Sequence, residues 1–307
     1  MSAVRLTESR QDAHLLAMDL LFDMETRDPD DVLTLCLVAT HPDVRLRGVT
    51  VNPGTPAQIG VVRHLLKRTG REDVRVGART PNADREAVSP FHRTWLGALP
   101  SAEPDSLAHE LLAELLTQWP EAVLLTGAPL HNMRLLLNHH PDVVIQRWVA
   151  QGGFAGDNLV PPHLRLPEFE GMTSCLSFNF NGDKKGAQLA LGSVRIRRRE
   201  LVSKNVTHGL IYDVSLHDRL APHRTATAGL ALIHEAMGHY LAENPAGKML
   251  HDPLAACVPI EPAIATLVEV EVVYTEGRWG SRPATGTGTF ITIDVDRERF
   301  FATFVRS

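Results

Sequence analysis

Carboxylates crowd together directly after the first long apolar run of this 307-residue chain. The segment FDMETRDPDDV, residues 22–32, carries them at five of nine consecutive positions. They are Asp23, Glu25, Asp28, Asp30 and Asp31. Like charges that share one site disfavour each other's ionised form. A divalent cation would relieve this repulsion, and carboxylate oxygens suit calcium or magnesium, so the cluster favours a metal site.

A helix start explains part of the cluster without any metal. Asp28 can serve as the N-cap, Pro29 fits the first helical position, and acids in the first turn interact favourably with the helix dipole. This accounts for Asp28 and one further acid. It does not explain why Asp23 and Glu25 converge on the same point, so both explanations stay open and metal binding is favoured.

Other polar residues with suitable chemistry occur later in the chain. Asp252, in the HDP segment at 251–253, begins a second apolar helix and is either an N-cap or part of the same site. Asparagines cluster in SFNFNGD, 177–183, and at Asn158. They are typical of turns, but an amide with two donors and one acceptor also suits a polyhydroxylated ligand such as a sugar.

The apolar pattern predicts a scaffold that would bring these residues together. Buried parallel strands are continuous apolar runs, whereas amphipathic helices repeat every 3.6 residues. We predict strands at 17–23, 44–51 and 73–77 and helices at 30–41 and 56–68. This alternation predicts a parallel sheet with right-handed crossovers. Ligands bind beyond the carboxyl ends of strands in such sheets, so the acid cluster lies where a site is expected.

The same alternation continues through the rest of the chain. Further helices are expected at 106–118 and 227–243, strands at 121–127, 142–153 and 194–203, β-rich segments at 265–275 and 287–295, and irregular loops at 78–103 and 153–175. The predicted fold class is α/β. A single large, doubly wound domain over 17–307 has a mostly parallel central sheet flanked by helices and follows a short N-terminal arm, 1–16.

Composition excludes several classes of protein. Hydrophobic residues make up 44% of the chain and charged residues 22%, which is ordinary for a globular protein. The net charge of −5 argues against a nucleic-acid surface built on bulk positive charge. No apolar run reaches the roughly 18–20 residues of a membrane span. Three widely separated cysteines lack zinc spacing and suggest reduced thiols, so a cytoplasmic location is expected.

Several segments, in order, resemble the inosine-uridine nucleoside hydrolase family. The family's opening motif, Asp-x-Asp-x-Gly-x-Asp-Asp, is matched by residues 23–31. The other similar segments are HPDVRLRGVTVNPGT (41–55), LLTGAPLHN (124–132), QGGFAGDN (151–158), SFNFNGDKKGA (177–187), LVSKNVTH (201–208) and HDPLA (251–255). Together they extend over roughly residues 17–305, and their order makes the resemblance specific.

The resemblance implies an activity and a metal ion. Members hydrolyse the N-glycosidic bond of ribonucleosides with a calcium ion that binds the ribose hydroxyls and the attacking water. They are usually homodimers or homotetramers. The implied metal ligands in this chain are Glu25, Asp30, Asp31, the carbonyl of Thr126, and Asp252. Glu25 is also the implied general base, with His251 placed to meet the leaving base.

The resemblance also implies which residues contact the substrate. The implied ribose contacts are Asp30, Asn158 and Asn179, with Ser177 and Thr55 at further sugar-contacting positions. Residues expected near the leaving group are His92, His239 and Tyr240, although a solvated helix face is the simpler explanation for the last two. Asp23 and Asp28 are expected to support the site from behind its ligands.

The sequence departs from the family pattern where the sugar is held. Glu25 replaces an aspartate, and the opening motif has one additional residue, so Asp28 is an alternative general base. Ser177 replaces a glutamate that helps to hold the 5′-hydroxyl, and Thr55 stands where an asparagine is expected. We therefore expect a modified or 5′-substituted nucleoside rather than a common one.

Neither of two other polar motifs is favoured as a zinc or phosphate site. HEAMGH, 234–239, resembles a zinc motif, but its second histidine is five residues on, about 140° around the helix from the first. The basic stripe RIRRRE, 195–200, is interpreted as a solvated strand face or a subunit contact, with phosphate binding as a minority alternative.

Two functions from different classes remain. The first is a calcium-dependent N-ribohydrolase. The second is a non-catalytic protein that binds a riboside or a metal on the same scaffold. The acid at position 25 together with Asp31, Asp252 and Asn179 favours the enzyme, whereas Ser177 keeps the second hypothesis open.

Overall fold

The structure is a computed structural model that describes residues 17–81, 83 and 86–307. In it the chain forms an α/β fold around one large sheet. The predicted arm, 1–16, lies outside the described residues. The sheet has eleven strands in the order β4-β3-β2-β1-β5-β6-β8-β13-β11-β12-β7. Their bounds are β1 Met18–Met24, β2 Val44–Val51, β3 Arg75–Ala78, β4 Ser106–Leu107, β5 Val123–Thr126, β6 Ile145–Gln151, β7 Ser174–Cys175, β8 Ile196–Val202, β11 Ala265–Thr275, β12 Arg278–Pro283 and β13 Thr289–Val295. The predicted fold class is confirmed.

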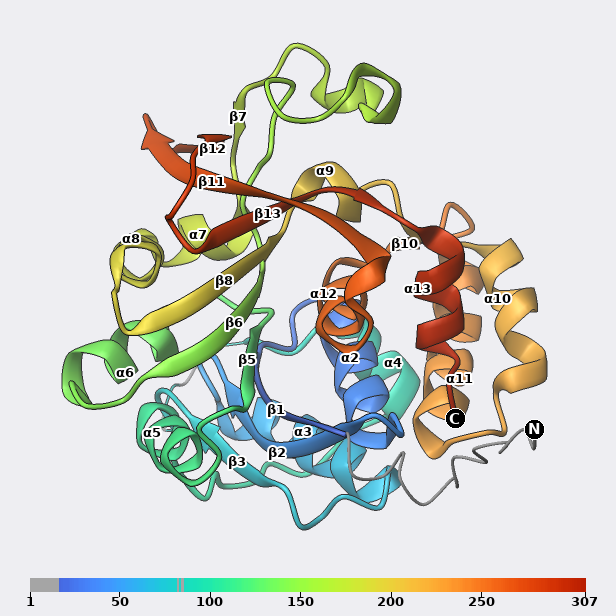
Figure 1. Ribbon diagram of the computed structural model, residues 1–307. Coiled ribbons are helices and arrows are strands. Elements are labelled where there is room, and N and C mark those ends of the chain that lie inside the picture. Colours follow the sequence, from blue (N-terminus) through green and yellow to red (C-terminus); the bar gives the residue numbers. More distant parts are fainter. Residues whose placement is uncertain (1–16, 82, 84–85) are drawn as a thin grey trace, which may run out of the picture.

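Helices cover both faces of this sheet (Figure 1). The α-helices are α2 Pro29–Thr40, α3 Pro56–Arg68, α4 Pro90–Leu96, α5 Ala108–Gln118, α6 His131–His139, α7 Phe178–Gly182, α8 Lys184–Gly192, α9 Lys204–Thr207, α10 Val214–Leu220, α11 Ala228–Glu243, α12 His251–Ile260 and α13 Arg297–Phe304. The 3₁₀ turns are η2 Pro162–Leu164, η3 Pro167–Phe169, η4 Ala221–His223 and η5 Pro262–Ile264, and β9 Ile211–Tyr212 pairs with β10 Lys248–Met249 in a small separate sheet.

Strand β1 lies in the interior of the sheet, between β2 and β5, and separates two hydrophobic cores. Leu20 and Phe22 point to the core formed with α2, α3, α11 and α12. Leu21 points to the opposite core, formed with α5, α6 and α8. Successive side chains of a strand alternate between its faces, so a strand buried on both sides must be apolar throughout. This explains the uninterrupted apolar run that precedes the acid cluster.

Parallel pairing aligns the carboxyl ends of the central strands. In the register, Asp23 of β1 lies opposite Thr50 of β2 and Thr126 of β5. Thr126 in turn lies opposite Ala150 of β6. The loops that leave these strands, and the helices that begin there, therefore meet at one edge of the sheet, which is where the site residues were expected.

The far side of the sheet is extended by antiparallel strands. Strand β13 pairs in parallel with β8, but β11 pairs antiparallel with both β13 and β12, and β12 with β7. The sheet is therefore mixed. The extension carries the segment around β7 toward the edge where the site lies, and α7 follows β7 directly.

Helix boundaries follow the sequence signals closely where those signals are strong. The predicted strand 44–51 and helix 56–68 coincide with β2 and α3. Helix α3 begins with a capping box in which the Thr55 hydroxyl accepts from the Gln58 amide and the Gln58 side chain accepts from the Thr55 amide. The short helices α4 and α6 were not predicted. Helix α4 lies within the segment 78–103, for which an irregular loop was expected.

Candidate active site

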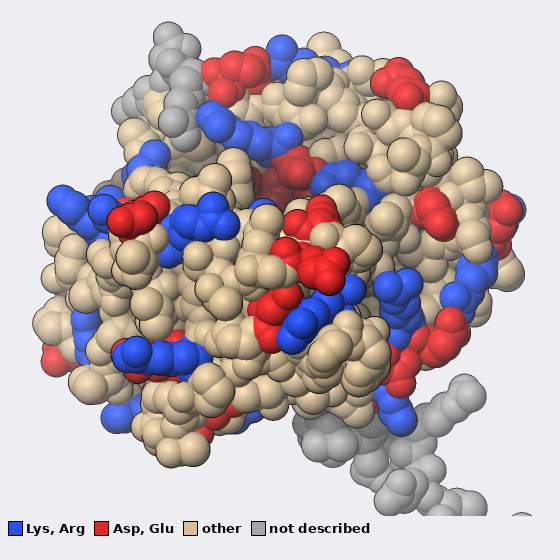
Figure 2. All heavy atoms as spheres, turned by 90° about the horizontal axis from the view of Figure 1, so that it is seen from above, with Lys and Arg blue, Asp and Glu red and all other residues tan. Residues whose placement is uncertain are grey.

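A cavity of about 490 Å³ opens at the carboxyl edge of the central strands. It is lined by Glu25, Arg27, Asp28, Asp30, Asp31, Gly127, Gln151, Ser177, Phe178, Asn179, Lys204, His208, His251 and Asp252. Eight of the fifteen predicted site residues are in this lining, and the fold brings acids from both ends of the sequence together. Here Glu25, Asp28, Asp30, Asp31 and Asp252 are called the acidic floor. Figure 2 shows acidic atoms deep in a hollow on this face of the molecule, with basic side chains at its border.

Part of the acidic floor is explained by the start of helix α2. Asp28 is the N-cap in an extended conformation, and Pro29 occupies the first helical position. One oxygen of Asp31, Oδ2, accepts from the backbone amide of Asp28 at 3.1 Å. The helix-start explanation is therefore correct for Asp28 and Asp31, and each of them still lines the cavity.

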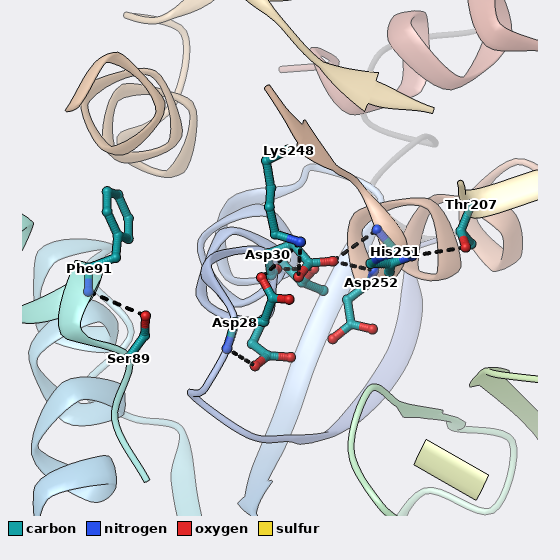
Figure 3. Close-up of polar contacts among 10 residues, drawn as sticks. Asp28, Asp30, Ser89, Phe91, Thr207, Lys248, His251 and Asp252 are labelled. Atoms are coloured by element: carbon teal, nitrogen blue, oxygen red, sulfur yellow. Dashed lines mark hydrogen bonds and ion pairs between the residues drawn. The ribbon is translucent and has the colours of Figure 1, made fainter. Parts of the chain in front are cut away.

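Asp30 joins the start of α2 to the start of α12. Its Oδ2 accepts from the backbone amides of His251, at 2.9 Å, and Asp252, at 3.0 Å (Figure 3). The first amides of a helix have no intrahelical acceptor, so this carboxylate satisfies two of them and also favours the helix dipole. Asp30 thereby holds Asp252 over the end of β1.

Lys248 neutralises part of the acidic floor. Its Nζ lies 2.8 Å from Asp28 Oδ1 and 3.5 Å from Asp30 Oδ1, and its side chain is only 11% exposed. Burial alone would lower the pKa of this ammonium, but the neighbouring Asp30 and Asp28 carboxylates raise the pKa above its ordinary value. Lys248 therefore stays charged, and both oxygens of Asp30 have partners within the protein.

The remaining acids repel one another in a buried place. Burial, followed by repulsion from Asp252 and Glu25, raises the pKa of Asp31 well above its ordinary value. Burial, followed by repulsion from Asp30, does the same to the pKa of Asp252. Glu25 is also buried. Such a set is more stable with a cation among its oxygens than without one.

One oxygen of this set is orphaned. Asp252 Oδ2 is buried and has no hydrogen-bond partner among the described residues. A Cβ at position 127 would lie 2.2 Å from it, so only glycine leaves room for the carboxylate there. A buried carboxylate oxygen without a donor fits a hard divalent cation, whose ligands are oxygens.

Side-chain acids alone do not complete a coordination shell. In the part of the chain that the structure describes, no group of three or more His, Cys, Asp or Glu side chains is already arranged around a metal position. A calcium ion takes six to eight oxygens, some from backbone carbonyls and water. The acidic floor therefore fits a cation through Asp31, Asp252 and Glu25 only together with other oxygens and small side-chain adjustments.

Histidine 251 is neutral at physiological pH. Its Nδ1 lies 2.9 Å from Thr207 Oγ1, and its ring centroid lies 5.3 Å from that of His208. Burial, followed by the positive charge of Lys248, lowers the pKa of His251 to about 3. The imidazole can therefore orient a ligand by hydrogen bonding, but it does not hold a proton in reserve at neutral pH.

The opposite side of the cavity carries neutral polar groups. The amide of Asn179 donates to Gln151 Oε1 at 2.8 Å, while its own Oδ1 is buried without a partner among the described residues. Ser177 Oγ accepts from the backbone amide of Gly153 at 3.1 Å. Asn179 thus presents a free acceptor of the kind that a sugar hydroxyl could use.

Three of the predicted residues lie behind the cavity rather than on it. Asp23 Oδ1 accepts from Thr50 Oγ1 and Asn132 Nδ2, both at 2.7 Å, and burial raises the pKa of this acid to about 6. Thr126 Oγ1 accepts from the Trp148 indole at 2.9 Å, and the next residue, Gly127, lines the cavity. His92 is buried near Asp28, and burial lowers its pKa to about 4.

The other predicted residues are farther out. Thr55 caps α3, and Asn158 is exposed and donates to Ser281 O at 2.6 Å. His239 is exposed on α11. Tyr240 packs its ring against Phe91, with centroids 5.4 Å apart, and burial raises the pKa of its hydroxyl. The structure does not bring Thr55, Asn158 or His239 to the cavity lining.

Several lining residues were not recognised from sequence. They are Arg27, Gly127, Gln151, Phe178, Lys204 and His208. Lys248, which contacts the acidic floor, was also missed. Arg27 lies inside the opening acidic motif, and Lys204 and His208 lie inside the segment 201–208, so position in a motif was the available signal.

Comparison with known proteins agrees with this geometry. The sequence profile of the family described as inosine-uridine preferring nucleoside hydrolase matches residues 20–302. A search of curated proteins found no significant match.

Solved structures with the same fold cover nearly the whole chain. An inosine-uridine preferring nucleoside hydrolase from Bacillus anthracis is 22% identical, with a TM-score of 0.70, over 94% of this chain and 97% of that one. A purine-preferring ribonucleoside hydrolase from Gardnerella vaginalis is 18% identical, with a TM-score of 0.66, over 94% and 96%. The plant nucleoside hydrolase PpNRh1 is 19% identical, with a TM-score of 0.67, over 94% and 97%. At these identities the likeness shows the fold.

Proposed function

The chain belongs to the inosine-uridine preferring nucleoside hydrolase family and is a hydrolase that acts on N-glycosyl bonds. On this basis we propose which substrate it cleaves and what its own residues do. The proposal is a calcium-dependent N-ribohydrolase that acts on a modified or 5′-substituted nucleoside. The observation that carries it is the convergence of Glu25, Asp31 and Asp252 with the free acceptor of Asn179 in one cavity.

A metal ion is required in this family, and calcium is the ion proposed here. Asp31, Asp252 and Glu25 would hold it, with the carbonyl of Thr126 as an expected further ligand. When bound, the ion would supply a Lewis acid that lowers the pKa of a water molecule. The support is the orphaned Asp252 Oδ2 and the mutual repulsion of the buried acids. A direct ligand role for Asp30 stays a prediction, because its oxygens already face His251, Asp252 and Lys248.

Glu25 is proposed as the general base. Its carboxylate is buried at the cavity and can accept the proton of the attacking water as the oxygen bonds to the sugar carbon. N-glycoside cleavage passes through an oxocarbenium-like state, so the surrounding carboxylates favour the transition state over the neutral ground state. Asp28, also on the acidic floor, is the alternative base.

The remaining roles concern orientation. Asn179 would accept from a ribose hydroxyl through Oδ1, and Ser177 leaves room near the same wall for a substituent. His251, neutral at pH 7, would position the leaving base by hydrogen bonding. The predicted roles of Thr55, Asn158, His92, His239, Tyr240 and Asp23 stay predictions, as do the homodimer or homotetramer and the cytoplasmic location.

No helix in the described part of the chain is long and apolar enough to cross a membrane.

The first experiment is release of reducing sugar from a panel of ribosides, with added calcium and with chelator. The panel includes common, base-modified and 5′-substituted nucleosides. We expect calcium-dependent release from at least one member, and Glu25→Gln is expected to lower kcat by roughly 10²–10⁴-fold, the usual contribution of a general base.

Glu121→Gln, at an exposed position before β5, is the matched control and should retain full activity. Full activity in Glu25→Gln would reject the base assignment. The ion pairs of Lys248 with Asp28 and Asp30 favour a second candidate, a non-catalytic riboside-binding protein, because they neutralise part of the acidic floor. Calcium binding without release from any panel member would support that candidate.

A further inference from the structure

The two sides of the cavity differ in charge. Its carboxylates all come from the segments that begin α2 and α12. The wall formed by Ser177, Phe178, Asn179 and Lys204, here called the α7–α9 wall, carries no carboxylate among the cavity-lining residues. Figure 2 shows acidic atoms deep in the hollow, with basic side chains beside it.

Three cationic side chains lie at or beside this cavity, but only one is neutralised. Lys248 pairs with Asp28 and Asp30. Arg27 is exposed at the cavity and forms no ion pair with any described residue within the usual 4 Å. Lys204 likewise has no carboxylate partner in the described chain. One cation with carboxylate partners therefore lies beside the cavity, and two cations without a carboxylate partner among the described residues line it.

The surroundings of Lys204 leave its charge available. Its Nζ donates to the carbonyl of Leu176 at 3.3 Å, lies 3.9 Å from Cys175 Sγ, and lies 5.7 Å from the centroid of the Phe169 ring. These contacts hold the ammonium in place without cancelling its charge. The Lys204 side chain is only partly exposed, so its ammonium has lost part of its hydration. A bound anion would offset this desolvation cost.

The acid that contacts His208 on this side of the cavity is already engaged. Glu168 Oε1 lies 2.9 Å from His208 Nδ1 and is about half exposed. The groups that contact Lys204 are thus a carbonyl, a thiol and an aromatic ring, and none of them supplies a negative charge.

We propose that the substrate is a phosphorylated riboside whose phosphate monoester is bound by Lys204, with Arg27 adding positive potential at the cavity mouth. This rests on the proposed function and narrows its substrate class. A phosphate monoester carries −1.5 to −2 charges at pH 7, and lysine binds it as a point charge. The acidic floor repels such a group, so the phosphate can lie only on the α7–α9 wall while the sugar hydroxyls face the acids.

The reaction leaves the phosphate ester intact. The bond between the anomeric carbon and the base nitrogen breaks, and the electron pair stays with the base. Water forms the new bond to the anomeric carbon, one of its protons passes to Glu25, and the base takes up a proton. The products are a sugar phosphate and a free base, with no change in oxidation state.

The kinetic test compares a nucleoside with its 5′-monophosphate in the wild-type protein, Lys204→Gln and Arg27→Gln. We expect the wild type to show at least tenfold higher kcat/KM for the monophosphate. In Lys204→Gln the ratio of the two kcat/KM values should fall roughly 10–100-fold, the effect of losing one charge-assisted hydrogen bond. Arg27→Gln should lower it less. Lys185→Gln, at an exposed position on α8, is the matched control and should leave the ratio unchanged.

A binding test separates this inference from the proposed activity. Titration calorimetry with ribose 5-phosphate, ribose and inorganic phosphate requires no turnover. Binding of ribose 5-phosphate that weakens at least tenfold in Lys204→Gln, with much weaker binding of ribose, supports the phosphate site even if no panel compound is hydrolysed. Two results would overturn the inference without contradicting the proposed hydrolase activity. One is hydrolysis of the nucleoside without preference for the monophosphate, and the other is equal binding of ribose 5-phosphate by the wild type and Lys204→Gln.

Discussion

The acidic floor and the α7–α9 wall face each other across one cavity but are built in different ways. The floor is buried and tied to the ends of helices: Asp31 accepts from the amide of Asp28, and Asp30 accepts from two amides of α12. The wall presents side chains with unused capacity, among them the Oδ1 of Asn179 and the ammonium of Lys204. A substitution on the acidic floor is therefore expected to change both stability and catalysis, whereas a substitution on the α7–α9 wall can change ligand binding alone.

The largest expected effect concerns Asp252. We expect Asp252→Asn to lower kcat/KM more than roughly 100-fold, since even residues that only support metal ligands contribute 10–100-fold. In chelator, the same variant should unfold at a higher temperature than the wild type, because one of several repelling buried carboxylates is removed. With saturating calcium the order should reverse, because the wild type gains binding free energy.

Calorimetric scans of both proteins with calcium and with chelator measure this reversal. An unchanged order of unfolding temperatures in the two conditions would show that Asp252 does not interact with the ion. The acidic floor would then differ from the α7–α9 wall only in its role in the fold, and not in metal binding.

The second effect tests whether the floor depends on Lys248. Lys248→Met should lower the free energy of unfolding by about 3–5 kcal/mol in chelator, because it leaves Asp28 and Asp30 without their buried counter-charge. Arg282→Met breaks an exposed ion pair with Glu271 on the antiparallel extension, and it should change stability by at most about 1 kcal/mol. Urea titrations of both variants measure the contrast, and equal losses would contradict it.

The third effect concerns pH and the acid behind the floor. Burial raises the pKa of Asp23 from 3.8 to about 6, so the folded state binds this proton more tightly than the unfolded state does. Its ionisation therefore lowers stability as pH rises from 4 through 6, by roughly 3 kcal/mol in all. Asp23→Asn should gain stability relative to the wild type over that interval, and urea titrations at each pH in chelator measure the gain. A difference that does not vary with pH would contradict the assignment.

The smallest effect on stability is expected on the wall. Phe178 lines the cavity and is 67% exposed, so Phe178→Ala should change the free energy of unfolding by less than about 0.5 kcal/mol. Its KM should nevertheless rise severalfold if the ring packs on the substrate. Phe290→Ala, on β13 under Arg198, is a control for KM and should leave it unchanged. A large loss of stability in Phe178→Ala would show that the wall is as structural as the floor.

The sequence predicted helix and strand boundaries best where a local pattern specifies them. Strand β2 and helix α3 matched because an apolar run and a capping box each specify their boundaries. Helix α6 was missed because its sequence, HNMRLLLNH, has a short apolar stripe between histidines and asparagines. The acids were found because they follow the first strand, and the carboxyl ends of parallel strands meet.

Long-range geometry limited the prediction of the site. Asn158 was expected at the ribose, but its amide donates to Ser281 on β12, a strand of the antiparallel extension that local pattern did not reveal. Lys204 and Lys248 were missed because the direction of a long charged side chain depends on what packs around it. A motif gives the position of such a residue in the chain and not its orientation.

The contact between Asp30 and the amides of α12 joins residues 221 and 222 positions apart. During synthesis, the acid that completes the floor is added only after more than four-fifths of the chain has been made. Contacts of such high sequence separation form late, after the loop between them has closed. A nascent or truncated chain that ends before α12 therefore has the first acidic motif but lacks Asp252 and the two amides that Asp30 contacts, so its site is incomplete.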